Sequence, residues 1–127
     1  VYKRQDPESL KDLNQLVHPE VEKHFTQWLS HQNSAYVIQE NPLLFEKKKE
    51  DQYDAVIVVA APTELRIDRV MKRDGASKAE VEARLANQMD QAYKVERATY
   101  IIENDRDLRR CRDSVISIHQ ELLSEIP

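Results

Sequence analysis

The sequence predicts an α/β protein in which helices flank a parallel β-sheet. Three short segments have the β-branched composition of strands, namely AYVIQE (35–40), DAVIVVAAP (54–62) and TYIIE (99–103). Segments with helical periodicity lie between the second and third of these and after the third, and such alternation is typical of parallel sheets. The middle segment is almost continuously apolar, which predicts a strand covered on both faces.

Composition indicates a soluble chain that forms one domain or part of one. It has 127 residues, of which 33% are charged, and its net charge is -4. This balance argues against a sequence-independent nucleic-acid binder. The sequence has no apolar run long enough to span a membrane and no signal peptide, so no membrane partner is expected. The single cysteine, Cys111, favours a reducing, cytoplasmic location.

The N-terminal region has one feature that looks non-native. Residues 1–5, VYKRQ, resemble the translated end of a transposon used to prepare sequencing libraries, so we expect a non-native leader and a true chain that begins upstream of Asp6. Asp6 as N-cap and Pro7 at the first helical position then predict a helix. Pro19 is expected to end it and to begin a second one.

Capping signals define the helices that follow the apolar strand. Thr63 is expected to cap a helix that ends at Gly75, and SKAE from Ser77 has the pattern of a capping box. A polar helical segment then continues to about Arg97. Apolar residues three and four apart predict a last helix, at Leu108, Cys111, Val115, Ile118 and Leu122. Three strands make a narrow parallel sheet, so we expect the chain to be the second half of an α/β domain.

Two arginines are the first candidates for a binding site. Arg69 and Arg73 are four residues apart, so their guanidinium groups lie on one side of the predicted helix. Guanidinium binds phosphate through two parallel hydrogen bonds and stacks on flat rings, so the pair could hold a nucleotide. Salt bridges to Asp68 or Asp74 are the alternative, and the spacing alone favours them.

Other candidates are weaker when each is taken alone. Asn104 follows the third strand, at the edge where α/β sheets bind ligands, but a simple Asx-turn is the better interpretation without further information. His18 precedes a proline and is more often a cap or a surface residue than a ligand. The turn NPLLFE (41–46) is unusually apolar for a loop, which indicates contact with a ligand or with the core.

The order of these motifs along the chain is more specific than any one of them. The informative residues are His18-Pro19, Pro42-Leu43-Leu44-Phe45-Glu46, Arg69, Arg73-Asp74-Gly75, Gln88, Lys94 and Asn104. From about Asp6 to Leu108 the sequence resembles the dephospho-coenzyme A kinases, which belong to the P-loop nucleoside-monophosphate-kinase-like group. The resemblance implies part of a three-layer P-loop NTPase-type fold.

The resemblance also implies a reaction and its participants. Such a kinase transfers the γ-phosphoryl group of ATP, bound with Mg²⁺, to the ribose 3′-hydroxyl of dephospho-CoA. By this resemblance Arg69 and Asn104 lie near adenine, Arg73 lies near phosphate, and Arg73 and Lys94 are the catalytic candidates. The acceptor would contact His18, Pro42, Leu43, Leu44 and Glu46. The competing interpretation of the turn, equally favoured, is that Leu43, Leu44 and Phe45 only close the end of the sheet.

The resemblance divides the chain into functional regions. Residues 6–34 would form acceptor-side helices, 35–76 the core, 77–97 a mobile lid, and 98–127 the last strand and helix. Asp90, Thr99 and Arg106 depart from the usual family pattern. With one glycine, the sequence has no G-x-x-x-x-G-K-[ST] phosphate loop, so we expect little or no kinase activity from this chain alone. The alternatives are another small-molecule kinase of the group and a non-catalytic nucleotide- or CoA-binding module.

Overall fold

The structure is a computed structural model that describes residues 7–125. The predictions for the VYKRQ leader and for the Asp6 cap fall outside the described residues. The chain divides into two compact units, one up to Gln39 and one from Glu40 onward.

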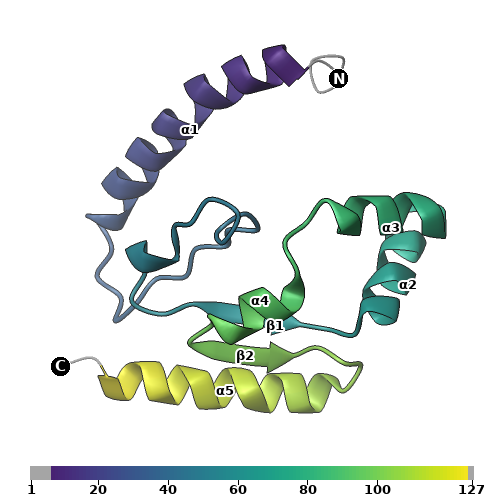
Figure 1. Cartoon of the computed structure of the whole chain (residues 1–127). Coiled ribbons are helices and arrows are strands. Elements are labelled where there is room, and N and C mark those ends of the chain that lie inside the picture. Colours follow the sequence, from purple (N-terminus) through teal and green to yellow (C-terminus); the bar gives the residue numbers. More distant parts are fainter. Residues whose placement is uncertain (1–6, 126–127) are drawn as a thin grey trace. The chain divides into compact units, whose positions relative to one another are not determined.

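The first unit contains one helix where the sequence predicted two. Helix α1 runs without interruption over Pro7–Leu29, with Pro19 inside it (Figure 1). The prediction that Pro19 ends a helix was therefore wrong. A proline removes one backbone donor and crowds the carbonyl group four residues earlier, which weakens a helix locally. Here the backbone hydrogen bonds on both sides of that position continue the helix.

The segment 35–40 does not form the predicted strand. It is irregular, and its Ile38 side chain is largely exposed. A strand exists only when its backbone pairs with a neighbour, so a β-branched composition is not sufficient. Within the described residues, the sheet contains two strands rather than the three expected.

The second unit is built on a parallel pair of strands, which confirms the predicted α/β class. Strand β1 (Ile57–Ala60) lies beside β2 (Tyr100–Glu103), with Ile57 opposite Tyr100 and Ala60 opposite Glu103. The hydroxyl of Thr99 accepts a hydrogen bond from the Val56 N–H at 3.0 Å and extends the pairing by one step.

Helix α2 (Thr63–Asp74) follows β1, and one of its two predicted ends is correct. Gly75 ends the helix in the left-handed conformation, with φ of 66°, and donates its N–H to Met71 O at 2.9 Å. The predicted start was off by one residue, because Pro62 takes the extended N-cap conformation and makes no side-chain cap. Thr63 is the first helical residue, and its hydroxyl accepts from Arg66 instead.

The chain between α2 and β2 forms two helices. Helix α3 (Lys78–Ala86) begins with the predicted capping box, in which Glu80 accepts from the Ser77 N–H at 2.8 Å. Helix α4 (Gln91–Glu96) begins after a break and is capped by Asp90. A short 3-10 helix, η2 (Glu50–Gln52), precedes β1.

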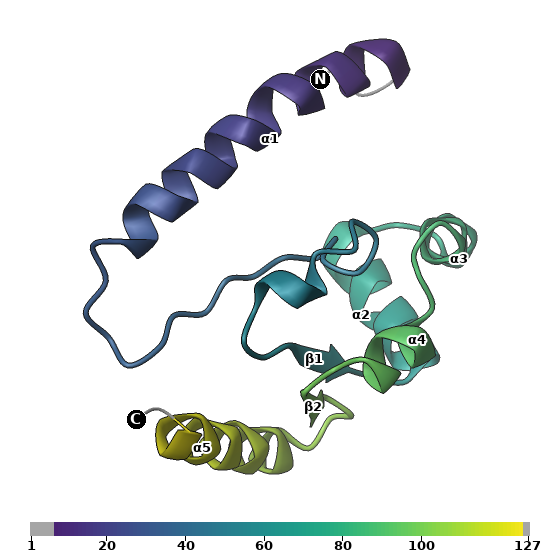
Figure 2. The same cartoon turned by 60° about the vertical axis from the view of Figure 1, so that its left-hand side comes forward.

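Helix α5 (Leu108–Glu125) is the last element and packs along β2 (Figure 2). Ile102 of β2 is 8% exposed, whereas its register partner Val59 of β1 is 58% exposed. The expectation that β1 is covered on both faces was therefore wrong for the described residues. The buried core of this unit comprises Phe45, Val56, Ala60, Ala61, Leu65, Ile67, Val81, Ile102 and Ile118.

Candidate functional site

The candidate site lies where both strands end. Because β1 and β2 are parallel, Ala60 and Glu103 lie at the same edge of the sheet. Asn104 follows at once, and its backbone N–H donates to Ala60 O at 2.7 Å. The next residue after β1, Ala61, donates its backbone N–H to the side-chain oxygen of Gln91 in α4 at 3.4 Å. The chain segments that leave both strands and the start of α4 therefore meet at the carboxyl edge, which is where open α/β sheets bind ligands.

Arg69 and Asn104 form a two-point contact at this edge. The guanidinium group of Arg69 donates from Nη1 to Asn104 O at 3.0 Å and from Nη2 to Asn104 Oδ1 at 3.1 Å. A guanidinium group has donors only, so the amide atom facing it is the oxygen. The amide NH₂ group of Asn104 is then left to donate elsewhere. The structure thus places in direct contact two residues that were separate candidates when each was considered by its own motif.

Arg73 has a different partner from Arg69. Its Nε and Nη2 donate to the two carboxylate oxygens of Asp74, at 2.7 and 3.2 Å. Arg84 of α3 donates to the same carboxylate at 3.3 Å. The bonds from Arg73 hold the pKa of Asp74 below its ordinary value. Arg73 therefore forms a salt bridge with Asp74, which is one of the two that the spacing favoured.

Glu46 and Lys94 form an ion pair that joins the NPLLFE turn to α4. Their Oε1 and Nζ atoms are 2.6 Å apart, and the side chains are 24% and 20% exposed. The Met89 N–H donates to the same Glu46 oxygen at 3.4 Å. Burial alone would raise the pKa of Glu46, but the hydrogen bond and charge of Lys94, with the backbone donors, outweigh it and leave this pKa lowered.

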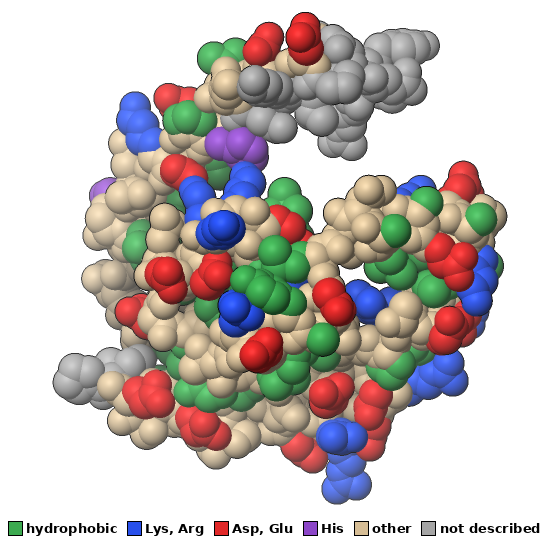
Figure 3. Space-filling model, viewed as in Figure 1, with side chains coloured by type: hydrophobic (Ala, Val, Ile, Leu, Met, Phe, Trp, Pro, Cys, Tyr) green, Lys and Arg blue, Asp and Glu red, His purple; other side chains and the backbone are tan. Residues whose placement is uncertain are grey.

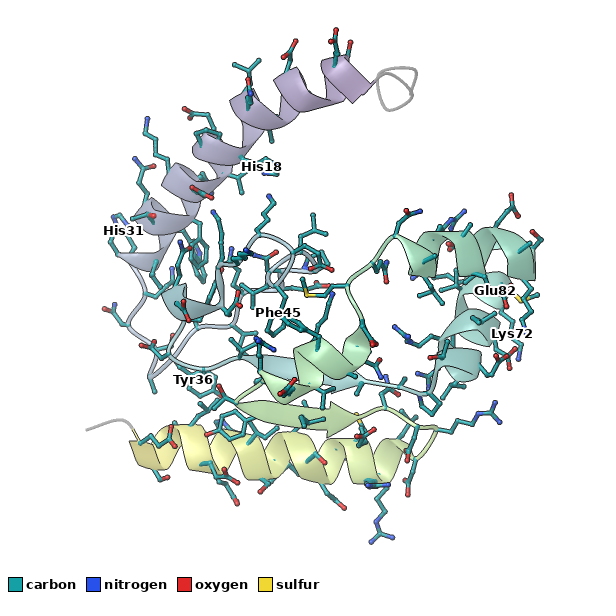
Figure 4. The ribbon with its side chains drawn as sticks, viewed as in Figure 1. His18, His31, Tyr36, Phe45, Lys72 and Glu82 are labelled. Atoms are coloured by element: carbon teal, nitrogen blue, oxygen red, sulfur yellow. The ribbon has the colours of Figure 1, made fainter. Side chains whose placement is uncertain are left out.

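The remaining acceptor-side candidates have different environments. Phe45 is buried (Figure 4), Leu44 is half-buried, and Pro42 and Leu43 are exposed. The turn therefore contributes Phe45 to the core and leaves Leu43 exposed. His18 lies within α1, in the first unit, and is half-buried.

Sequence reasoning missed two groups that the site uses. Gln91 and Arg84 bond to residues 30 and 10 positions away, so no local motif marks them. Thr99 was noted only as a departure from a family pattern, yet its hydroxyl accepts a hydrogen bond from Val56, just before β1.

Two other kinds of feature, a metal site and a membrane-spanning helix, were sought among the described residues. None of their groups of His, Cys, Asp and Glu could hold a metal ion. Among the described helices, none combines the length and apolar character required to cross a membrane. Acidic and basic side chains are interspersed over the visible face of residues 40–125 (Figure 3).

Comparison with solved structures defines the class of protein. A crystal structure of a Thermus thermophilus protein superposes with a TM-score of 0.80 at 42% identity, over 92% of this chain and 61% of that one. A dephospho-CoA kinase from Campylobacter jejuni superposes with a TM-score of 0.64 at 31% identity, over 94% and 61%. The fold is thus that of P-loop NTPases, of which this chain contains a part.

Sequence comparison identifies the family. The sequence model of dephospho-CoA kinase matches residues 3–110. The chain is 44% identical over 115 residues to the dephospho-CoA kinase of Thermus thermophilus, and 39% identical over 94 residues to that of Bacteroides fragilis. These matches include 88% and 73% of this chain but 57% and 46% of the relatives. The chain belongs to the dephospho-CoA kinase family and spans about half the length of these relatives.

Proposed function

We propose that the chain is the C-terminal portion of an ATP-dependent kinase that phosphorylates the ribose 3′-hydroxyl of dephospho-CoA, which completes CoA. Family membership supports the reaction, and the match to about three fifths of the solved relatives supports a partial domain. In this proposal the phosphate loop and the Mg²⁺ ligands belong to residues outside the given sequence. A cytoplasmic location is part of the proposal, since the one cysteine suits a reducing compartment.

The contact between Arg69 and Asn104 is the observation that carries the proposal. Because Arg69 occupies the side-chain oxygen of Asn104, the amide NH₂ is the group available to a ligand. A purine ring nitrogen is an acceptor of suitable kind for it. The flat guanidinium group of Arg69 offers a stacking surface for the same ring. Both groups lie at the carboxyl edge of the sheet, where a nucleotide base is expected.

Two further cations are proposed to neutralise phosphate charge during transfer. Arg73 and Lys94 are each bound to a carboxylate in the structure, Arg73 to Asp74 and Lys94 to Glu46. A triphosphate carries more negative charge than one carboxylate and competes for these cations. Phosphoryl transfer depends on such positioning and charge neutralisation. Closure of the lid over 77–97 would bring Lys94 to the phosphates.

The turn after Asn41 is proposed to contact the acceptor. Leu43 is exposed and offers an apolar surface to the nucleoside or the pantetheine arm of dephospho-CoA, beside Pro42. Leu44 is half-buried. Glu46 completes the proposed acceptor set of this unit.

The experiment is to supply the missing part of the domain. We would join the N-terminal portion of the Thermus thermophilus relative to this chain and measure ATP-dependent conversion of dephospho-CoA to CoA. The chain alone should be inactive and the chimera active. In the chimera, Arg69→Ala should lower kcat/KM by about tenfold to a hundredfold, while Arg112→Ala on the exposed surface of α5 should change it little.

Two results would favour the alternative functions. Turnover with a nucleoside monophosphate but not with dephospho-CoA would identify another small-molecule kinase. Tight binding of nucleotide or CoA by the chain, with no turnover in the chimera, would identify a binding module.

A further inference from the structure

We infer that Glu46 is a positioning residue for Lys94, which fixes the ammonium group of Lys94 and the start of α4 before any nucleotide binds. The part played by Lys94 in the reaction rests on the proposed function, whereas the contact does not. Glu46 was expected only as a residue that touches the acceptor. The structure gives its carboxylate a partner on the other side of the site, 48 residues away in sequence.

The environment of the pair distinguishes it from the other ion pairs of the molecule. The Glu46 and Lys94 side chains are 24% and 20% exposed, whereas Glu64 and Lys78 are 77% and 53% exposed. Charges that are mostly removed from water attract each other more strongly, and either one is costly to leave alone. Surface pairs such as Lys78 with Glu64 contribute little. The Glu46 carboxylate is therefore a more suitable anchor for a lysine side chain than the exposed Glu64 carboxylate.

The same carboxylate also holds the chain just before α4. Its Oε1 atom accepts from both Lys94 Nζ and the Met89 N–H. Its Oε2 atom is buried and has no hydrogen-bond partner among the described residues, so Lys94 is the cation that neutralises it. Losing the charge at position 46 would weaken both contacts at once.

Helix α4 depends on such contacts for its position. It has six residues, which is too short for a helix to be stable by itself in water. Besides Glu46, it is held by packing on β1 and by the bond from Ala61 to Gln91.

The first test measures the anchor in the chain itself, by amide hydrogen exchange. Glu46→Gln should lower the protection of the amides of α4 by about tenfold or more, while β2 and α5 keep theirs. The matched control is Glu64→Gln, which breaks the exposed pair with Lys78 and should leave α4 unchanged. Unchanged protection of α4 in Glu46→Gln would overturn the inference. If that variant fails to fold, the exchanged pair Glu46→Lys with Lys94→Glu provides the same measurement, and it should restore protection.

The second test separates positioning from simple stabilisation, in the active chimera. The exchanged pair restores an attraction between the turn and α4 but moves the ammonium group to the turn. We expect α4 protection to return while kcat stays at least about tenfold low. Full turnover by the exchanged pair would show that the pair only stabilises the fold and would overturn the positioning role. An inactive chimera with both residues intact would refute the proposed function, and the exchange measurement would still decide whether Glu46 anchors α4.

Discussion

The contact between Arg69 and Asn104 can be divided into its two hydrogen bonds by mutation. Arg69 donates once to the backbone oxygen of Asn104 and once to the side-chain oxygen, at 3.0 and 3.1 Å. Asn104→Ala removes only the second bond, whereas Arg69→Ala removes both. A double-mutant cycle of these two changes therefore reports the side-chain bond alone. The effect of Arg69→Ala that persists in the Asn104→Ala background reports the backbone bond.

The size of each effect follows from exposure and charge. A hydrogen bond from a charged donor contributes about 1.5–3 kcal/mol when well protected, and a solvated ionic contact contributes about 1 kcal/mol or less. Arg69 is exposed and Asn104 is half-buried. We expect a coupling free energy of about 0.5–1 kcal/mol for the side-chain bond and a total loss of about 1–2 kcal/mol for Arg69→Ala.

The assay is urea unfolding of the chain and its variants, followed by far-UV circular dichroism. Fluorescence would be misleading because Trp28 lies in α1, in the other unit. With a slope of about 1 kcal/mol/M, the coupling corresponds to a difference of about 0.5–1 M in the midpoint. Arg73→Ala with Asn104→Ala is the matched control, since Arg73 bonds Asp74 instead, and this cycle should be additive. A coupling below about 0.3 kcal/mol between positions 69 and 104 would refute the reasoning.

Three further predictions concern single positions. Although burial opposes it, the bond from Lys94 lowers the pKa of Glu46 from 4.5, so the stability that this gives is present above pH 4.5 and is lost as the pH falls below it. Lys94→Met should therefore reduce the pH dependence of the unfolding free energy in that window, and an unchanged slope would contradict the assignment. Ser77→Ala should cost about 1 kcal/mol in urea unfolding through loss of the α3 cap, with an exposed change such as Ala79→Ser as control. Gly75→Ala should cost about 1–2 kcal/mol in the same assay because its φ is 66°; the added methyl group meets no atom within 4 Å, so a much larger loss would point to a steric cause instead.

The sequence predicted best those features that depend on neighbouring residues. The left-handed end of α2 at Gly75 and the capping box at Ser77 each involve a few consecutive positions, and both are present. Thr63 failed as a cap because the preceding Pro62 already has the N-cap conformation. Pro19 failed as a helix end because one lost hydrogen bond does not outweigh the helix on either side.

Features that depend on residues distant in the sequence could not be predicted from local motifs. The segment 35–40 has the composition of a strand but no pairing neighbour in the described structure. Spacing alone treated Arg69 and Arg73 as an equivalent pair, yet one bonds Asn104, 35 residues away, and the other bonds its immediate neighbour. The pairing of Glu46 with Lys94 had no local signal at all. Only the family resemblance placed these two pairs in one hypothesis about a single kinase site.

The parallel pairing of β1 and β2 has a consequence for how the chain reaches its native state. Val56 and Thr99, which begin the pairing, are 43 residues apart, and α2, α3 and α4 all lie between them. Closing so large a loop has an entropic cost before any strand contact compensates for it, whereas α2 and α3 have local contacts of their own. We expect α2 and α3 to form early and the strands to pair late, so that the edge carrying Asn104 is among the last parts of the molecule to be assembled.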